Sequence, residues 1–265
     1  MTTDSKNTQW AQRCRALVGW LFRASATLRH SHGETPATPT PAGGTEKPLI
    51  VLVHGYEGSV SEFRALIACL QPALGDRFDF ALVDTLDPSM GLAPEENAAR
   101  IDEYLTAHSL QSRDLYFICH SLGGLIARCY SHRGNAASRV RALTMIATPN
   151  GGINWWNILP IHWMRSAGFT ERFNAIYPAL SAIRYQLLVG TKGANLVEGA
   201  PNDGVVGRWS VEAFLGCGDH CTAVMTRCYP LDHWALLRDP QVAADIAAFF
   251  PYVQENIPQE TPTSR

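Results

Sequence analysis

The 265-residue sequence lacks any apolar run approaching the roughly 20 residues that a membrane-spanning helix requires. Only 17% of its residues are charged, and the formal net charge of −2 shows no basic excess of the kind that binds nucleic acid. It also has no internal repeat. These absences argue against a spanning helix, a nucleic-acid partner and a repeat architecture. With 46% hydrophobic residues, the chain is long enough to bury one sizeable core.

A clear secretory signal is also lacking at the N-terminus. The apolar stretch Ala16–Phe22 is short, has arginines on both sides, and meets no small-residue cleavage site before Arg29. Residues 1–30 are instead predicted to form an amphipathic helix. It could dock on the folded body, make peripheral membrane contact as an interfacial helix, or act as a targeting peptide. We therefore expect a cytoplasmic or peripherally membrane-associated protein, and export stays open as an alternative.

The remaining chain divides into a linker, one folded domain and a tail. Residues 31–47 are rich in Pro, Thr and Gly and predict an extended linker, and residues 253–265 predict a polar tail. Between them, residues 48–252 alternate short apolar runs with helical patterns, which predicts an α/β fold with a mostly parallel sheet of about six strands and helices on both faces. Strands are expected at residues 48–55, 78–86, 115–120, 141–149, 184–191 and within 223–233, and helices at 61–74, 94–108, 122–132 and 239–250.

Residues 150–181 interrupt this alternation. The segment NWWNILPIHWMRSAGF carries three tryptophans between two predicted strands, where a plain crossover helix would suffice. It is either a longer crossover packed on the core or an apolar cap over a site, and we predict a Trp-rich cap insertion.

The stretch YFICHSLGGL places Ser121 between a predicted buried strand and a predicted helix. A sharp strand-turn-helix elbow would lift the hydroxyl clear of the sheet and aim the N–H groups of the helix start at the same point. Gly123 would let the helix start pass close to the strand. Cys119 stands where a G-x-S-x-G pattern has its first glycine, at a position that needs a small side chain. The alternative is an ordinary serine-capped helix.

Two further side chains complete a nucleophilic set in the order that such a sheet requires. A serine hydroxyl needs a base, and the base needs an orienting acid. Asp203 follows the fifth predicted strand and His233 follows the sixth, and in parallel sheets functional groups gather at the carboxyl ends of strands. Asp84 and Asp232 are alternative acids.

With these motifs in place, the sequence resembles the α/β-hydrolase superfamily, and within it bacterial lipases and related serine esterases. The resemblance implies cleavage of carboxylic esters through an acyl-serine, with Ser121 as nucleophile, His233 as base and Asp203 as acid. It also implies an oxyanion hole formed by the backbone N–H groups of Tyr56 and Leu122. The matching segments are VHGYEGS, CHSLGG, ATPNGG, PNDGVV and LDHWALLRDP.

Two other functions remain open. An acyltransferase would pass the same acyl group to an alcohol or thiol, and a binding protein would keep the fold without catalysis. The expected partner is a small-molecule or lipid ester. No cofactor and no metal in the site are expected, and the oligomeric state is not predicted. Some lipases of this kind bind a structural calcium, for which the acidic candidates are Asp203, Asp219 and Asp232.

The seven cysteines fall into two groups. Four isolated ones are expected to be small buried thiols in a reducing compartment: Cys14, Cys69, Cys119 and Cys129. The cluster Cys217, Cys221 and Cys228, with His220, has three open interpretations: free thiols, a disulfide, or a zinc site of unusual spacing.

Overall fold

The computed structural model describes residues 46–56, 58–85, 93–153, 168–193, 201–216 and 224–256. The predicted N-terminal helix and almost all of the linker lie outside the described residues. So do the tryptophan-bearing part of the predicted cap, at 154–167, and most of the predicted polar tail.

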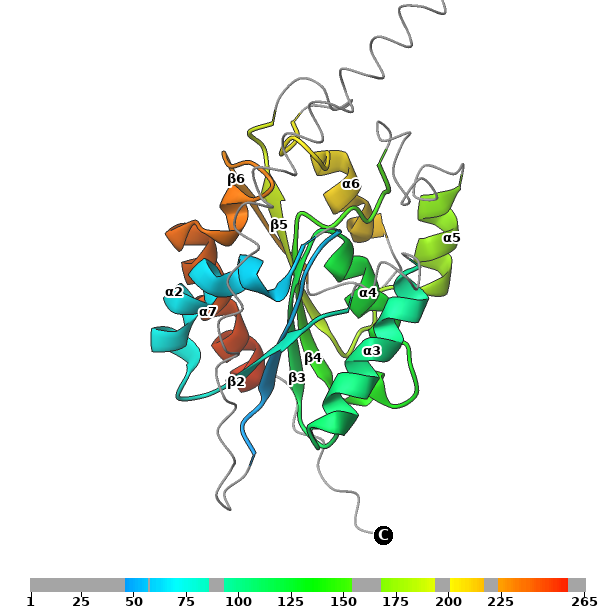
Figure 1. The fold of residues 1–265 in the computed structure, drawn as a ribbon. Helices are drawn as coiled ribbons and strands as arrows, with labels where there is room; N and C mark the ends of the chain where they lie inside the picture. Colours follow the sequence, from blue (N-terminus) through cyan, green and yellow to red (C-terminus); the bar gives the residue numbers. More distant parts are fainter. Residues whose placement is uncertain are drawn as a thin grey trace, which may run out of the picture. The chain divides into compact units, whose positions relative to one another are not determined.

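A single sheet organises the described residues. It has six strands in the order β2-β1-β3-β4-β5-β6, and every neighbouring pair is parallel, which confirms the predicted parallel sheet (Figure 1). The chain runs from β1 to β2 on one side and then returns to β3 on the other side of β1. The loops after β1 and β3 therefore diverge at a topological switch point, where open α/β sheets bind ligands. The strands are β1 (Leu49–Val53), β2 (Asp79–Val83), β3 (Leu115–His120), β4 (Val140–Ile146), β5 (Arg184–Gly190) and β6 (Val224–Tyr229).

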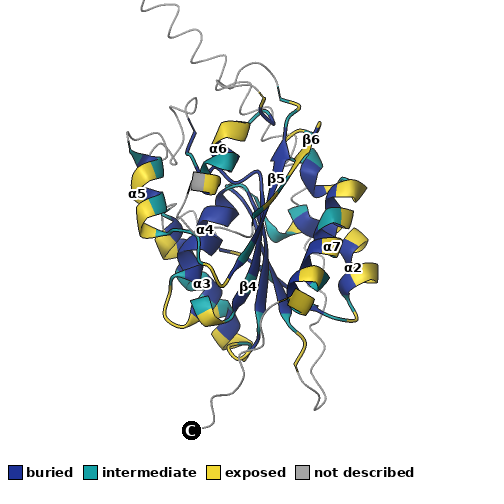
Figure 2. Cartoon of the chain, turned by 180° about the vertical axis from the view of Figure 1, so that it is seen from behind, coloured by how far each residue is buried: buried dark blue, intermediate teal, exposed yellow. Residues whose placement is uncertain are grey.

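Helices cover both faces of the sheet, as predicted. Figures 1 and 2 show α2 and α7 on one face and α3, α4 and α5 on the other. The helices are α2 (Arg64–Leu74), α3 (Pro94–Ala107), α4 (Leu122–Ser131), α5 (Phe169–Ile176), α6 (Arg208–Glu212) and α7 (Pro240–Asn256). Short 3₁₀ segments accompany them at η1 (Val60–Phe63), η2 (Ala136–Ser138), η4 (Ala213–Gly216) and η5 (Ala235–Leu237).

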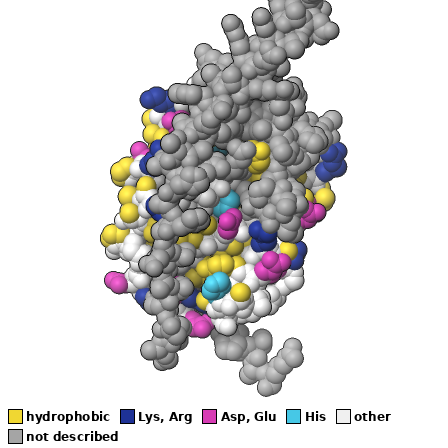
Figure 3. Space-filling view, in the orientation of Figure 1, with side chains coloured by type: hydrophobic (Ala, Val, Ile, Leu, Met, Phe, Trp, Pro, Cys, Tyr) yellow, Lys and Arg dark blue, Asp and Glu magenta, His cyan; other side chains and the backbone are white. Residues whose placement is uncertain are grey.

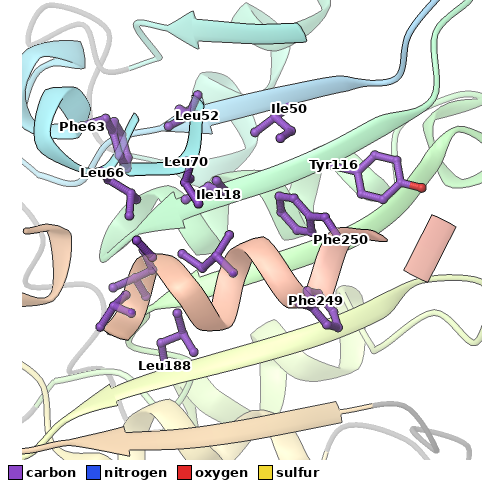
Figure 4. Close-up of a cluster of buried hydrophobic side chains, with 14 of the residues drawn as sticks. Ile50, Leu52, Phe63, Leu66, Leu70, Tyr116, Ile118, Leu188, Phe249 and Phe250 are labelled. Carbon is purple, nitrogen blue, oxygen red and sulfur yellow. The ribbon is translucent and has the colours of Figure 1, made fainter. Parts of the chain in front are cut away.

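The core between the sheet and the α2–α7 layer combines aliphatic and aromatic side chains. Every residue of β1 and β3 is buried, as expected for central strands covered on both faces. The ring of Tyr116 on β3 lies edge-on to Phe250 of α7 at a centroid distance of 5.4 Å (Figure 4). It also lies edge-on to Phe78, at 5.0 Å. Leu66 and Leu70 of α2 line the same core. These contacts pack α2 and α7 against the sheet whose strands lead into the loops of the candidate site.

Two sequence predictions about helices need correction. The last helix was expected to end at Phe250, but α7 continues through Pro251 to Asn256. Proline removes one backbone donor, yet Val253 beyond it is buried, so packing on the core continues past the proline. The short helix α6 was not expected, because five residues are too few to show a helical period.

The cysteine predictions hold in part. Cys119 and Cys129 are buried as expected, but the prediction for Cys69 is wrong, because its side chain is exposed. The buried stripe of α2 runs through Leu66, Leu70 and Leu74, and Cys69 lies off that stripe. Cys14, Cys217 and Cys221 lie outside the described residues. Cys228 is described, on β6, and is exposed and free.

The described residues carry six α-helices and, on the face drawn in Figure 3, side chains of mixed charge. None of their helices combines the length and the apolar character needed to cross a membrane. Among the side chains coloured in Figure 3, acidic and basic groups are scattered between hydrophobic ones. The sheet topology points to the carboxyl edge, at the switch point between β1 and β3.

Candidate active site

Ser121 occupies a sharp elbow between β3 and α4. Its backbone has φ 52° and ψ −124°, a conformation that a residue other than glycine rarely adopts. The Ser121 N–H donates to the Ile146 carbonyl at 2.8 Å, so the serine stands directly at the end of the sheet ladder. A Cβ on Gly123 would lie 2.3 Å from the carbonyl oxygen of Val53, so only glycine lets α4 start this close to β1.

The loop after β1 lies against this elbow. A Cβ built on Gly55 would lie 2.8 Å from the Cβ of Ser121. The two predicted oxyanion donors therefore belong to adjoining segments: Tyr56 is next to Gly55 in this loop, and Leu122 is the first residue of α4. The first N–H groups of an α-helix have no acceptor within the helix, which leaves the Leu122 N–H suited to a ligand.

Asp203 and His233 form a buried pair at the same sheet edge. The Nδ1 of His233 lies 2.7 Å from Asp203 Oδ2, and the side chains are 4% and 1% exposed. The other carboxylate oxygen, Oδ1, accepts the backbone N–H groups of Val205 and Val206 at 2.9 and 2.6 Å. The His233 N–H donates to the Asp203 carbonyl at 3.0 Å. The acid is thus held by its own loop and holds the histidine ring in turn.

The alternative acids have other contacts. Asp84 lies 2.8 Å from Nε2 of His54, whose Nδ1 lies 3.0 Å from the Gly55 carbonyl. Burial lowers the pKa of His54, but the hydrogen bond to Asp84 and further contacts outweigh burial and raise it overall. Asp232 accepts the backbone N–H groups of Trp234 and Ala235 and so caps the turn after His233.

His120 links the elbow to the His233 loop. Its Nε2 lies 3.1 Å from the His233 carbonyl, which can only accept, so Nε2 carries a proton and donates it. The two rings are 4.6 Å apart between centroids. Because His120 precedes Ser121, this contact brings the loops of the predicted nucleophile and base together.

Cys119 is not a rival nucleophile. Its side chain is fully buried, and burial raises the pKa of its thiol well above the ordinary value. A thiol in that state stays protonated and unreactive at neutral pH.

Glu62 is the site residue that the sequence analysis missed. Its Oε1 lies 3.1 Å from Nδ1 of His120 and accepts the Gly55 N–H at 3.4 Å. In sequence it is only an acidic residue near the start of a predicted helix, a common pattern with no functional meaning by itself.

A metal centre does not emerge from the described residues. No group of three or more His, Cys, Asp or Glu side chains in the described ranges could hold an ion. Asp219, His220 and two cysteines of the cluster lie outside these ranges, so the zinc, disulfide and calcium alternatives stay predictions.

Among protein-family models, residues 21–159 match the one described as "Domain of unknown function (DUF7379)". That match spans more than half of the chain. The chain belongs to the DUF7379 family. A search of curated proteins found no match.

Several solved structures share the fold of this DUF7379 family member. The mature lipase BlEst2 of Bacillus licheniformis is 20% identical, with a TM-score of 0.58 over 81% of this chain and 95% of the lipase. The metagenomic carboxyl esterase MGS0156 is 18% identical, with a TM-score of 0.56 over 85% and 82%. Est1E from Butyrivibrio proteoclasticus is 16% identical, with a TM-score of 0.55 over 80% and 90%. The expected structural resemblance to bacterial lipases and esterases is confirmed, and the fold is that of the α/β-hydrolases.

Proposed function

We propose that this DUF7379 protein is a serine hydrolase that cleaves carboxylic esters through an acyl-serine intermediate. The observation that carries the proposal is the buried Asp203–His233 pair, held at the sheet edge where Ser121 occupies its strained elbow. Strain in a serine that follows a buried strand is typical of a nucleophile that must stand clear of the sheet.

The protonation of His233 supports its role as the base. With Asp203 ionised, Nδ1 donates its proton to the carboxylate, which leaves the lone pair of the neutral ring on Nε2. In the proposed reaction, Nε2 takes the Ser121 proton while Oγ attacks the ester carbonyl. The tetrahedral intermediate then expels the alcohol, which receives that proton. A water molecule attacks the acyl-serine by the same steps and releases the acid.

The oxyanion of each tetrahedral intermediate would be bound by the Tyr56 and Leu122 N–H groups. The contact between Gly55 and Ser121 supports this assignment, because it brings the loop of Tyr56 to the start of α4. Removing one such donor typically costs about 3–4 kcal/mol of transition-state stabilisation.

The proposed substrates are small-molecule or lipid esters. The names of two fold relatives, a lipase and a carboxyl esterase, support this class. A series of nitrophenyl esters of increasing acyl length would separate the two: preference for long chains supports a lipase, and activity confined to acetate or butyrate supports an esterase.

The decisive experiment removes the proposed nucleophile. Ser121→Ala should lower kcat for nitrophenyl butyrate by about 10⁴-fold or more and abolish labelling by a fluorophosphonate probe. Ser131→Ala is the matched control, because Ser131 ends the same helix and bonds only to the backbone of Ala127 among the contacts described. Full activity in the Ser121 variant, with a native thermal transition, would refute the proposal.

A further inference from the structure

Glu62, in η1, contacts the loop proposed to form the oxyanion hole. Its carboxylate side chain is 16% exposed, and Oε1 accepts the Gly55 N–H at 3.4 Å. A Cβ built on Gly58 would lie 2.6 Å from its other oxygen, Oε2. Gly55 and Gly58, joined by a hydrogen bond from the Gly58 N–H to the Gly55 carbonyl, therefore both lie against this carboxylate.

From Glu62 a chain of contacts leads to the proposed base. Oε1 of Glu62 meets Nδ1 of His120 at 3.1 Å, and Nε2 of His120 donates to the His233 carbonyl at 3.1 Å. One carboxylate and one ring thus connect the loops that follow β1, β3 and β6. These loops carry the proposed oxyanion donor Tyr56, the nucleophile Ser121 and the base His233.

The charge on Glu62 fits this arrangement. Burial raises the pKa of its carboxyl, but the charge of His120 and the hydrogen bond to it outweigh burial, so the pKa lies below its ordinary value. The carboxylate is therefore ionised at neutral pH. Replacing a buried ion pair with apolar groups is often neutral or stabilising, so stability is a weak reason to keep one here.

We propose that Glu62 is a positioning residue, which acts with His120 to align the oxyanion loop and the His233 loop for the transition state. This inference rests on the proposed ester hydrolysis. Glu62 itself touches no reacting atom in the scheme. Its effect should appear in kcat and not in KM, because misplacing a catalytic group by about 1 Å can cost about 10²-fold in rate.

The test compares Glu62→Gln, His120→Asn and the double variant with nitrophenyl butyrate. A single oxygen, Oε1, meets both the Gly55 N–H and Nδ1 of His120. Glutamine keeps the size of the side chain but carries no charge. Its amide oxygen can accept from both the Gly55 N–H and His120 Nδ1 only if Nδ1 keeps its proton, and no carboxylate would then neutralise the charge of the His120 ring. We expect kcat, per site titrated with a fluorophosphonate, to fall about 10- to 100-fold in each single variant, with KM changed less than about 2-fold.

The double variant should lose no more activity than the more damaged single variant, because both changes interrupt one chain of contacts. Asp79→Asn is the control for losing a partly buried ion pair: Asp79 pairs with Arg113 at 2.6 Å, at the opposite end of the strands, and kcat should stay within about 2-fold. Should Glu62→Gln fail to fold, the kcat and KM of His120→Asn carry the test.

Full kcat in either single variant, or multiplying losses in the double variant, would overturn the positioning role while leaving the proposed function intact. A wild-type protein that neither hydrolyses the ester nor reacts with the probe would instead overturn the proposed function, and the positioning role with it.

Discussion

At the residue scale, the hydrogen bonds of Asp203 determine which nitrogen of His233 is free. Oδ1 faces two backbone donors, Val205 and Val206, so an asparagine here would keep its oxygen toward them and turn its NH₂ toward Nδ1. Nδ1 would then have to accept, which moves the ring proton to Nε2 and removes the base. We expect Asp203→Asn to lower kcat by about 10³- to 10⁴-fold with little change in the thermal transition.

The control for this prediction is Asp232→Asn, one residue from the same histidine. Asp232 caps a turn through Oδ1, a bond that asparagine can also make, so kcat should stay within about 2-fold of wild type. Equal activities in the two variants, measured with the same ester, would rule out Asp203 as the orienting acid.

Single residues also show how far the sequence could lead. Ser121, Asp203 and His233 could be selected from it because each follows a predicted strand, and parallel strands bring their carboxyl ends to one edge. Glu62 could not, because its meaning depends on the approach of Gly55 and His120 from two other loops. Such a contact leaves no periodicity and no motif in the chain.

At the element scale, α7 supports the sheet that carries the site loops. Phe250 is fully buried and packs against Tyr116 of β3, whereas Tyr252 on the same helix is 56% exposed. Phe250→Ala should cost about 3–5 kcal/mol of unfolding free energy, because it removes apolar contacts and leaves a cavity. At roughly 2–4 °C per kcal/mol, the Tm should fall by about 6–20 °C. Tyr252→Ala should change the unfolding free energy by less than about 0.5 kcal/mol, and similar losses in both variants would contradict this packing.

The elements themselves were predictable where burial dictates their pattern. The central strands β1, β3, β4 and β5 show as short apolar runs because the sheet is covered there on both faces, and helix starts such as Pro94 carry local signals. Ends set by packing were not predictable. The continuation of α7 past Pro251 depends on the burial of Val253, and α6 depends on contacts such as the Ser210 hydroxyl donating to the Gly152 carbonyl at 2.5 Å.

At the scale of the whole molecule, two contacts between a buried histidine and a carboxylate make stability depend on pH with opposite signs. The pKa of Glu62 is lower in the folded state than its ordinary value of 4.5. Its contribution is therefore fully present above pH 4.5 and is lost as the pH falls through the folded value. The pKa of His54 is raised above its ordinary 6.5, so its contribution is present below pH 6.5 and is lost as the pH rises through the folded value.

The measurement is the unfolding free energy, from urea titrations of wild type, Glu62→Gln and His54→Asn between about pH 3 and pH 9. The difference in unfolding free energy between wild type and Glu62→Gln should become smaller toward the acid end of the range. Protonating the wild-type carboxyl removes the same charge that the variant lacks. The difference in unfolding free energy between wild type and His54→Asn should become smaller toward the alkaline end, since the ring then loses its charge beside Asp84. If the free-energy difference between wild type and Glu62→Gln instead grows in acid, the Glu62 carboxylate is destabilised in the folded protein. An ionised Glu62 joining the oxyanion loop to His120 would then be ruled out.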